Sequence, residues 1–236
     1  AERKKKSSRG GDGCLAEETA ARISSQILSG ISYLHSKHIV HRDLKPENVV
    51  FESMEEDSPI RIVDFGLARK HYRDSFEPYM SAVVGSFHFV SPEVLGQKYD
   101  KACDLWSVGA VAFMMLCGRP PFDGATGKEV RDAVRRGKFT FETNHWKGPS
   151  KEAKDFVRRL LRSSPKKRMT AEDALEHPWL ARHGVGTSDQ ENRRGGDSLA
   201  KAKSERLQKR GPVLGERISS IGRGRSFGRS LSMLRL

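Results

Sequence analysis

The sequence has little cysteine and lacks the segments that mark secreted or membrane-spanning proteins. Only three of its 236 residues are cysteine, and none of them forms a C-x-x-C pair, which excludes a domain held together by several disulfides. No apolar run approaches the length of about eighteen residues that a membrane span needs. The first residues, AERKKKSSRGGDG, lack the apolar middle of a signal peptide. These absences predict an intracellular protein of a reducing compartment, namely the cytoplasm, with the nucleus as the alternative.

Positive charge is concentrated at the two ends of the chain. Lys and Arg exceed Asp and Glu by 3 in residues 1–13 and by 8 in residues 181–236, but by only 2 in residues 14–180. The last segment is rich in Arg, Ser and Gly, a composition typical of flexible tails. We therefore expect a basic lead-in at 1–13, one folded domain at 14–180 and an unstructured basic tail at 181–236.

Hydrophobic spacing predicts a mainly helical domain with short strands. Apolar residues recur at three- and four-residue steps in residues 16–35, which predicts an amphipathic helix. Residues 104–118 are apolar nearly all round, which predicts a buried central helix. Two β-branched runs, at 48–51 and 60–65, are joined by a polar stretch, as in a hairpin. Further helices are predicted at 127–137, 150–162 and 170–176.

Four polar residues stand in the order that phosphoryl transfer from a nucleotide needs. Asp43, Lys45 and Asn48 lie in the stretch HRDLKPENVV, and Asp64 follows sixteen residues after Asn48. A carboxylate such as Asp43 can orient a hydroxyl and accept its proton, and a cation such as Lys45 can offset charge at the transferring phosphoryl group. The amide of Asn48 and the carboxylate of Asp64 are oxygen ligands of the kind that Mg²⁺ prefers. Order and spacing together predict a catalytic site rather than a polar turn.

These motifs, with others downstream, resemble the C-terminal lobe of a eukaryotic serine/threonine protein kinase. HRDLKPEN resembles the catalytic loop, DFG the magnesium motif and SPE the Ala-Pro-Glu motif. DLWSVG resembles the central helix that anchors the catalytic loop. LCGRPPFDG is typical of the calcium/calmodulin-dependent group, which includes the calcium-dependent kinases of plants and protists. The resemblance covers roughly residues 14–180 and implies an α+β fold, namely a mainly helical kinase C-terminal lobe with short β-hairpins at the active site.

The resemblance implies ATP and Mg²⁺ as cofactors and assigns roles to individual residues. Asp43 and Lys45 are the expected catalytic pair, and Asn48 and Asp64 are the expected magnesium ligands. The expected cofactor-binding residues are Lys45, Glu47, Asn48 and Asp64. Lysine at position 45 favours Ser and Thr as acceptors, and Glu47 resembles a glutamate that reads arginine upstream of the acceptor, which implies basic protein substrates. Expected structural or regulatory residues are His41, Arg42, Phe65, Gly66, Ser86, Glu93, Asp104 and Arg168.

Several of these residues are expected to hold the fold rather than to react. The family stacks residues such as His41 and Phe65 into an internal spine, and Asp104 is expected to accept backbone N–H bonds. Arg168 resembles the arginine that pairs with the glutamate of the Ala-Pro-Glu motif, here Glu93. These residues are therefore predicted to position the site.

Two further residues are tied to the irregular segment 69–93, which follows no clear period and is of a kind that is usually functional. Arg42 is either a solvated charge or a ligand for a phosphorylated or acidic residue of this segment. Ser86 stands where such kinases usually carry a threonine that contacts the catalytic aspartate and lysine, and it retains the hydroxyl. Candidate phosphorylation sites in the segment are Ser75, Tyr79 and Ser81.

Three parts of a complete protein kinase are not found in the sequence: a Gly-rich strand turn over the phosphates, a lysine on the third strand and a helix glutamate that holds this lysine. The glycines within 10–13 and the lysines at 4–6 lie in polar surroundings with no flanking strand. Because the chain also starts with Ala1 rather than Met, we expect a fragment of a longer kinase, with slow or no phosphoryl transfer by this polypeptide alone. The alternative is a naturally short, catalytically silent kinase lobe that binds partners.

The segment 213–236 combines apolar positions at helical steps with arginines. The apolar positions are Leu214, Ile218, Ile221, Phe227, Leu231 and Leu234. Such a pattern is found in calmodulin targets and membrane-surface helices, so two readings stay open: regulation by calmodulin or by the segment itself, and a solvated tail. Nucleic acid is a weaker candidate partner because Phe227 is the only aromatic residue of the tail. Arg-x-x-Ser spacing predicts sites of self-phosphorylation or of phosphorylation by another kinase molecule at Ser220, Ser226 and Ser232.

Overall fold

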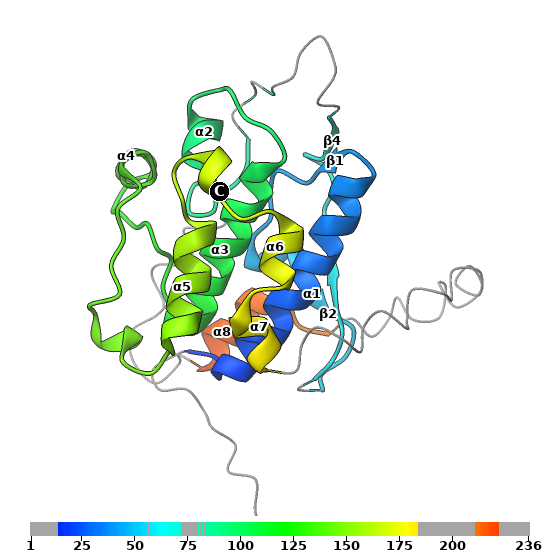
Figure 1. Cartoon of the computed structure of the whole chain (residues 1–236), viewed down its shortest axis with the longest axis vertical. Helices are drawn as coiled ribbons and strands as arrows, with labels where there is room; N and C mark the ends of the chain where they lie inside the picture. The colour runs from blue at the N-terminus through cyan, green and yellow to red at the C-terminus, as the bar shows by residue number, and fades with distance from the viewer. Residues whose placement is uncertain are drawn as a thin grey trace, which may run out of the picture.

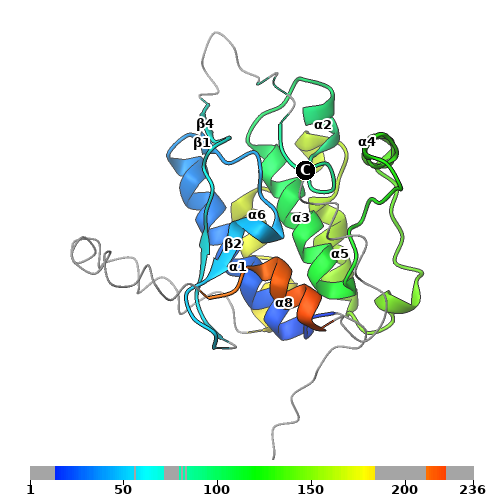
Figure 2. The same ribbon diagram turned by 180° about the vertical axis from the view of Figure 1, so that it is seen from behind.

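Helices are the main elements of the computed structural model, which describes residues 14–55, 57–71, 80, 82, 84–183 and 211–221 (Figures 1 and 2). The helices are α1 (Glu17–Ser36), α2 (Pro92–Leu95), α3 (Ala102–Cys117), α4 (Gly127–Arg136), α5 (Lys151–Leu160), α6 (Ala171–Leu175), α7 (Pro178–Arg182) and α8 (Leu214–Ile221). Short 3-10 turns are η1 (Pro46–Asn48), η2 (Asn144–Trp146) and η3 (Pro165–Lys167). The strands are β1 (Ile39–Val40), β2 (Val49–Phe51), β3 (Ile60–Ile62) and β4 (Arg69–Lys70). The predicted α+β fold with few short strands is confirmed.

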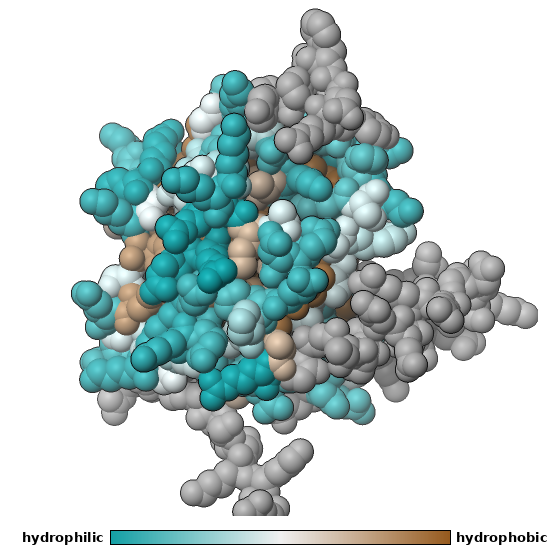
Figure 3. All heavy atoms as spheres, in the orientation of Figure 1, coloured by the Kyte–Doolittle hydropathy of each residue, from teal (hydrophilic) through white to brown (hydrophobic). Residues whose placement is uncertain are grey.

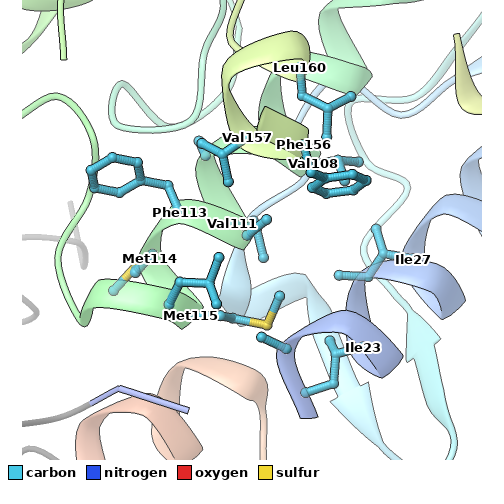
Figure 4. Close-up of a cluster of buried hydrophobic side chains, with 14 of the residues drawn as sticks. Ile23, Ile27, Val108, Val111, Phe113, Met114, Met115, Phe156, Val157 and Leu160 are labelled. Carbon is cyan, nitrogen blue, oxygen red and sulfur yellow. The ribbon is translucent and has the colours of Figure 1, made fainter. Parts of the chain in front are cut away.

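The central helix α3 lies in the middle of the hydrophobic core. Every residue from Cys103 to Cys117 is buried, as expected for a helix that is apolar on all sides. Figure 4 shows Ile23 and Ile27 of α1 and Phe156 of α5 among the side chains that surround it. The three helices thus form one continuous core, and the loops that carry the polar motifs lie at its edge.

Two small antiparallel sheets flank the HRDLKPEN stretch. β2 pairs with β3 with Val49 opposite Ile62, so the hairpin predicted from residues 48–51 and 60–65 is confirmed. β1 pairs with β4 with Val40 opposite Arg69. Because β1 ends directly before His41 and β2 begins directly after η1, the HRDLKPEN stretch is fixed at both of its ends.

A histidine caps the N-terminus of α7. The Trp179 N–H donates to His177 Nδ1 at 3.2 Å, so the neutral ring carries its proton on Nε2, which faces Asp155 Oδ2 at 3.3 Å. Burial lowers the pKa of His177, although the hydrogen bond and the charge of Asp155 act in the opposite direction. Protonation of Nδ1 would remove the acceptor that caps the helix.

Acidification is therefore expected to destabilise the chain through His177. The unfolded chain binds a proton near the ordinary histidine pKa while the folded chain resists it, so stability falls as the pH drops below about 6.5. In His177→Asn the capping acceptor is retained without a titrating ring. Urea midpoints measured between pH 7.5 and 5.5 should fall more steeply for the native chain than for this variant. Parallel pH curves for the two proteins would contradict the prediction.

The short helix α8 corrects one expectation from the sequence. The tail was predicted to be unstructured from residue 181 onward, but α7 continues to Arg182 and residues 211–221 pack on the domain. Leu214 and Ile218 are fully buried because they fill the space beside η1 and β2, next to which Figure 2 shows α8. These two apolar side chains thus serve the core. The rest of the tail, including Phe227, Ser226 and Ser232, lies outside the described residues, as do Ser75, Tyr79 and Ser81.

Backbone and side-chain contacts hold α8 against the β2–β3 hairpin. The Phe51 N–H donates to the Pro212 carbonyl at 3.2 Å, and Val50 forms an antiparallel bridge with Val213. The Arg217 guanidinium lies 3.7 Å from the centre of the Phe51 ring and donates to the Glu55 carbonyl at 2.6 Å. These contacts join segments that are more than 160 residues apart in the sequence.

Removing the apolar anchor of α8 is expected to destabilise the domain. Ile218→Ala should lower the free energy of unfolding by about 2 kcal/mol, because it leaves a cavity at a residue that is 1% exposed. Met54, on the neighbouring hairpin, is 79% exposed, so Met54→Ala should change stability by less than about 0.5 kcal/mol. Urea unfolding measures both variants. Equal effects would mean that α8 does not pack on the core in solution.

Candidate active site

Asp43 is the centre of a hydrogen-bond network at the end of β1. Lys45 Nζ donates to Asp43 Oδ2 at 2.7 Å and to Ser86 Oγ at 3.1 Å. The Ser86 N–H donates to Asp43 Oδ1 at 3.0 Å, and its hydroxyl lies 3.3 Å from the same oxygen. The catalytic loop and the segment that follows residue 84 are thus joined through one carboxylate, with a cation beside it.

Asn48 and Asp64 stand at the ends of the β2–β3 hairpin. Asn48 Nδ2 donates to the Asp43 carbonyl at 2.8 Å, and the Val63 N–H donates to the Asn48 carbonyl at 2.9 Å. Asp64 is exposed and has a positive φ of 63°, with its Oδ1 accepting from the Gly66 N–H at 3.2 Å. Within the described part of the chain, Asn48 Oδ1 and Asp64 Oδ2 accept no hydrogen bond. An amide oxygen and a carboxylate oxygen left open in this way fit a hard cation such as Mg²⁺.

Asp104 holds the backbone of the catalytic loop from α3. Its carboxylate accepts the His41 and Arg42 N–H groups, each at 2.9 Å, and His35 Nε2 at 2.9 Å. Burial raises the pKa of Asp104, but the hydrogen bonds from His35 and from the two N–H groups outweigh burial and hold the pKa below its ordinary value. The ionised form therefore stabilises the fold, and this contribution is lost only as the pH falls through the lowered pKa.

Arg42 connects the loop to the segment that follows Asp64. It adopts a positive φ of 69°, its Nε donates to the Leu67 carbonyl at 2.6 Å and its Nη1 lies 3.2 Å from the Tyr99 hydroxyl. The Tyr99 hydroxyl in turn donates to the Ala82 carbonyl at 2.7 Å, and burial raises the pKa of Tyr99. The acidic or phosphorylated partner expected for Arg42 belongs to the segment 69–93, of which residues 72–79, 81 and 83 lie outside the described residues.

Gly85 allows the close approach that places Ser86 on Asp43. A Cβ at this position would lie 2.7 Å from the Arg42 carbonyl oxygen, and the backbone has a φ of 97°. A larger residue would both strain the backbone and push the segment away from the catalytic loop. The glycine is thus part of the site.

A buried ion pair fixes the SPE motif. The Arg168 guanidinium donates to both carboxylate oxygens of Glu93, with 3.0 Å between Nη2 and Oε2, and to the Ala102 carbonyl at 2.7 Å. The Arg168 side chain is fully buried and that of Glu93 is 8% exposed. The pair therefore joins the N-terminus of α2, the start of α3 and the turn before α6.

The rings of His41 and Phe65 are in tilted contact, but only His41 is buried. Their ring centroids are 5.1 Å apart, while Phe65 is 48% exposed. The expectation that Phe65 belongs to an internal spine is therefore not met by its exposure. Glu47 belongs to η1. Its Oε1 lies 3.7 Å from the place that a Cβ added to Gly215 of α8 would take. Its buried Oε2 accepts no hydrogen bond from the described residues.

Comparison with known families agrees with this geometry. A family profile described as "Protein kinase domain" matches residues 4–180. The chain belongs to the protein kinase family.

The kinase is similar over most of its length to calcium-dependent protein kinases. It is 42% identical over 168 residues to calcium-dependent protein kinase 5 of Plasmodium falciparum (isolate 3D7) and 45% identical over 173 residues to calcium-dependent protein kinase 29 of Arabidopsis thaliana. Each match covers 71% of this chain but only 29% and 31% of the respective relative. The chain thus spans about a third of the length of these relatives, and the resemblance inferred from the motifs is confirmed.

The network that surrounds the kinase motifs includes residues that the sequence did not reveal. His35, Gly85 and Tyr99 support Asp104, Ser86 and Arg42 respectively, and each acts across the fold rather than along the chain. A lone histidine at the end of an amphipathic helix gives no signal of its role.

Among the described residues, no helix combines the length and the apolar composition that a membrane crossing needs.

Proposed function

We propose that this kinase transfers the γ-phosphoryl group of ATP to serine or threonine hydroxyls of basic protein substrates. The observation that carries the proposal is the contact of Asp43 with Lys45 at 2.7 Å, with Ser86 bonded to both. A carboxylate, a cation and a hydroxyl held together in this way match the needs of phosphoryl transfer. Members of the protein kinase family generally use ATP and Mg²⁺, and we propose both for this chain.

Each group has a definite part in the proposed reaction. As the substrate oxygen bonds to phosphorus and the bond to the ADP oxygen breaks, the hydroxyl proton passes to the Asp43 carboxylate. Lys45 offsets the negative charge that develops on the transferring group, and its bond to Ser86 keeps the ammonium in place. Bound Mg²⁺ would neutralise phosphate charge, with Asn48 and Asp64 as its protein ligands.

The assay that tests this function uses labelled ATP, Mg²⁺ and a basic serine peptide. The chain alone is expected to transfer phosphate slowly or not at all, because the Gly-rich turn and the clamping lysine are not found in its sequence. Joined behind the phosphate-clamping lobe of a protein kinase, it should gain activity. If the joined protein stays inactive although it is folded, the second candidate function, a silent kinase lobe that binds partners, is favoured.

Glu47 supports the preference for basic substrates. Its Oε2 is buried and lacks a donor among the described residues, and a guanidinium group of a substrate arginine would supply one once this oxygen is uncovered. Glu47→Gln should weaken binding of a labelled peptide with arginine upstream of serine about tenfold. Fluorescence anisotropy measures this affinity without any need for turnover. A peptide with alanine in place of the arginine should bind both proteins equally, and an equal loss for the two peptides would contradict the role of Glu47.

Regulation through residues 213–236 is also part of the proposal. The relatives are named calcium-dependent protein kinases. A calcium sensor of the calmodulin type could bind the apolar side of α8. It could do so only after Leu214 and Ile218 leave the core, where they are buried. Titration of the chain with calcium-loaded calmodulin tests this proposed regulation.

An intracellular site of action belongs to the same proposal, since all three cysteines are buried and none forms a disulfide.

A further inference from the structure

Two surface turns meet at the C-terminal ends of α4 and α5. Gly137 ends α4 with a φ of 61°, and a Cβ there would lie 2.2 Å from Ser163 Oγ, so the two turns are in contact. We name residues 135–138 and 162–167 the turn pair. The turn pair is separate in the sequence from the catalytic groups, because Asp43 and Lys45 belong to a different loop, between β1 and β2.

The second turn is held rigid from inside the protein. Arg168 Nε and Nη2 donate to the Arg162 carbonyl at 3.1 and 2.9 Å, while the same guanidinium pairs with Glu93. The 3-10 turn η3 lies between these two arginines. The exposed side chains of the turn therefore project from a fixed backbone.

The turn pair carries charge of one sign. It contains six Lys or Arg residues and no Asp or Glu. Arg135 is paired with Asp132 at 3.0 Å, and no ion pair among the described residues involves the other five. These five exposed cations are Arg136, Lys138, Arg162, Lys166 and Lys167.

A purely structural reading accounts for only part of this cluster. Cations in the last turn of a helix interact favourably with its dipole, and this explains Arg135 and Arg136 in α4 and the corresponding arginines of α5. Lys138, Arg162, Lys166 and Lys167 lie beyond the helix ends, where the dipole has no further effect. Hydrophilic residues cover the face of the molecule over α5 and α6 (Figure 3).

We propose that the turn pair binds an anionic lipid surface. Its cations project from exposed turns, and attraction to anionic headgroups adds up over such residues without the need for a shaped pocket. The basic ends of the chain, with net charges of +3 and +8, favour the same surface. Nucleic acid is less well supported, because the exposed large hydrophobic residues among those described are Tyr33, Met54, Phe65 and Phe87, none of which lies in the turn pair to stack on a base.

The test compares two charge reversals of equal size in the full chain. The first variant is Arg162→Glu with Lys166→Glu and Lys167→Glu. The control is Lys128→Glu with Lys147→Glu and Lys151→Glu, three exposed lysines outside the turn pair, two of them in the first turns of α4 and α5. Urea unfolding establishes that both variants are folded. Binding is measured by co-sedimentation with phosphatidylcholine vesicles that contain about 30% phosphatidylserine, at about 0.1 M salt.

The native chain is expected to bind these vesicles, and the turn-pair variant to bind at least about tenfold more weakly, while the control loses less than about twofold. Equal losses would assign the binding to net charge and overturn the proposal, as would equal binding of pure phosphatidylcholine vesicles. A labelled oligonucleotide provides the competing arm. If the turn-pair variant loses affinity for the oligonucleotide but not for the vesicles, the partner is nucleic acid and the lipid proposal is wrong.

Discussion

Glu93→Ala is expected to lower the free energy of unfolding by about 3–5 kcal/mol, because it leaves the Arg168 guanidinium buried without its counter-ion. The Arg168 side chain has no exposure to solvent, so water cannot replace the lost carboxylate. The remaining bonds from the guanidinium to the Ala102 and Arg162 carbonyls satisfy donors but do not neutralise the charge. Urea unfolding followed by circular dichroism measures the loss.

The matched control for this prediction is an exposed ion pair. Glu52 lies 2.9 Å from Arg61, and their side chains are 34% and 59% exposed. Glu52→Ala should change stability by less than about 1 kcal/mol, since solvent screens such pairs. Similar losses for Glu93→Ala and Glu52→Ala would show that the Glu93–Arg168 pair is not buried in solution.

Asp43→Asn is expected to lower phosphoryl transfer by roughly a thousandfold or more, in the protein joined to a phosphate-clamping lobe. An amide cannot accept the substrate proton, and its NH₂ group has no attraction for the ammonium of Lys45. The amide oxygen can still accept from the Ser86 N–H, which lies 3.0 Å from the native carboxylate. The fold should therefore persist, and turnover with labelled ATP should fall while the urea midpoint stays nearly unchanged.

Asp123→Asn is a suitable control because it makes the same chemical change at a side chain that is 57% exposed. Its turnover should equal that of the unmodified protein. Retained activity in Asp43→Asn would assign the proton acceptor to another group and overturn the proposed mechanism.

The parts of the fold that could be predicted from the sequence are those with local signals. The all-apolar helix α3 has no solvent-facing side, and the β-branched runs of β2 and β3 alternate with polar turns, so each pattern admits few structures. The order of Asp43, Asn48 and Asp64 likewise indicated the site, because this spacing brings a base and oxygen ligands together in one family of folds.

What could not be predicted depends on contacts between distant residues. His35 reaches Asp104 across 69 residues, and nothing next to either residue indicates the pairing. The docking of α8 was not predicted for a related reason, because an Arg- and Gly-rich composition predicts a solvated tail. Two buried side chains, Leu214 and Ile218, nevertheless hold this short helix on the apolar surface of the domain.

The position of α8 also has a consequence for biosynthesis. When the ribosome has finished α7, it has made every described helix except α8. The partner of Val50 is Val213, which lies about 30 residues beyond the end of α7. At ordinary elongation rates those residues take roughly two to six seconds to appear. During that interval the Phe51 face of the hairpin next to the catalytic loop remains uncovered on the nascent chain. A chaperone or a partner protein therefore has a defined time window in which to reach this face before the chain covers it.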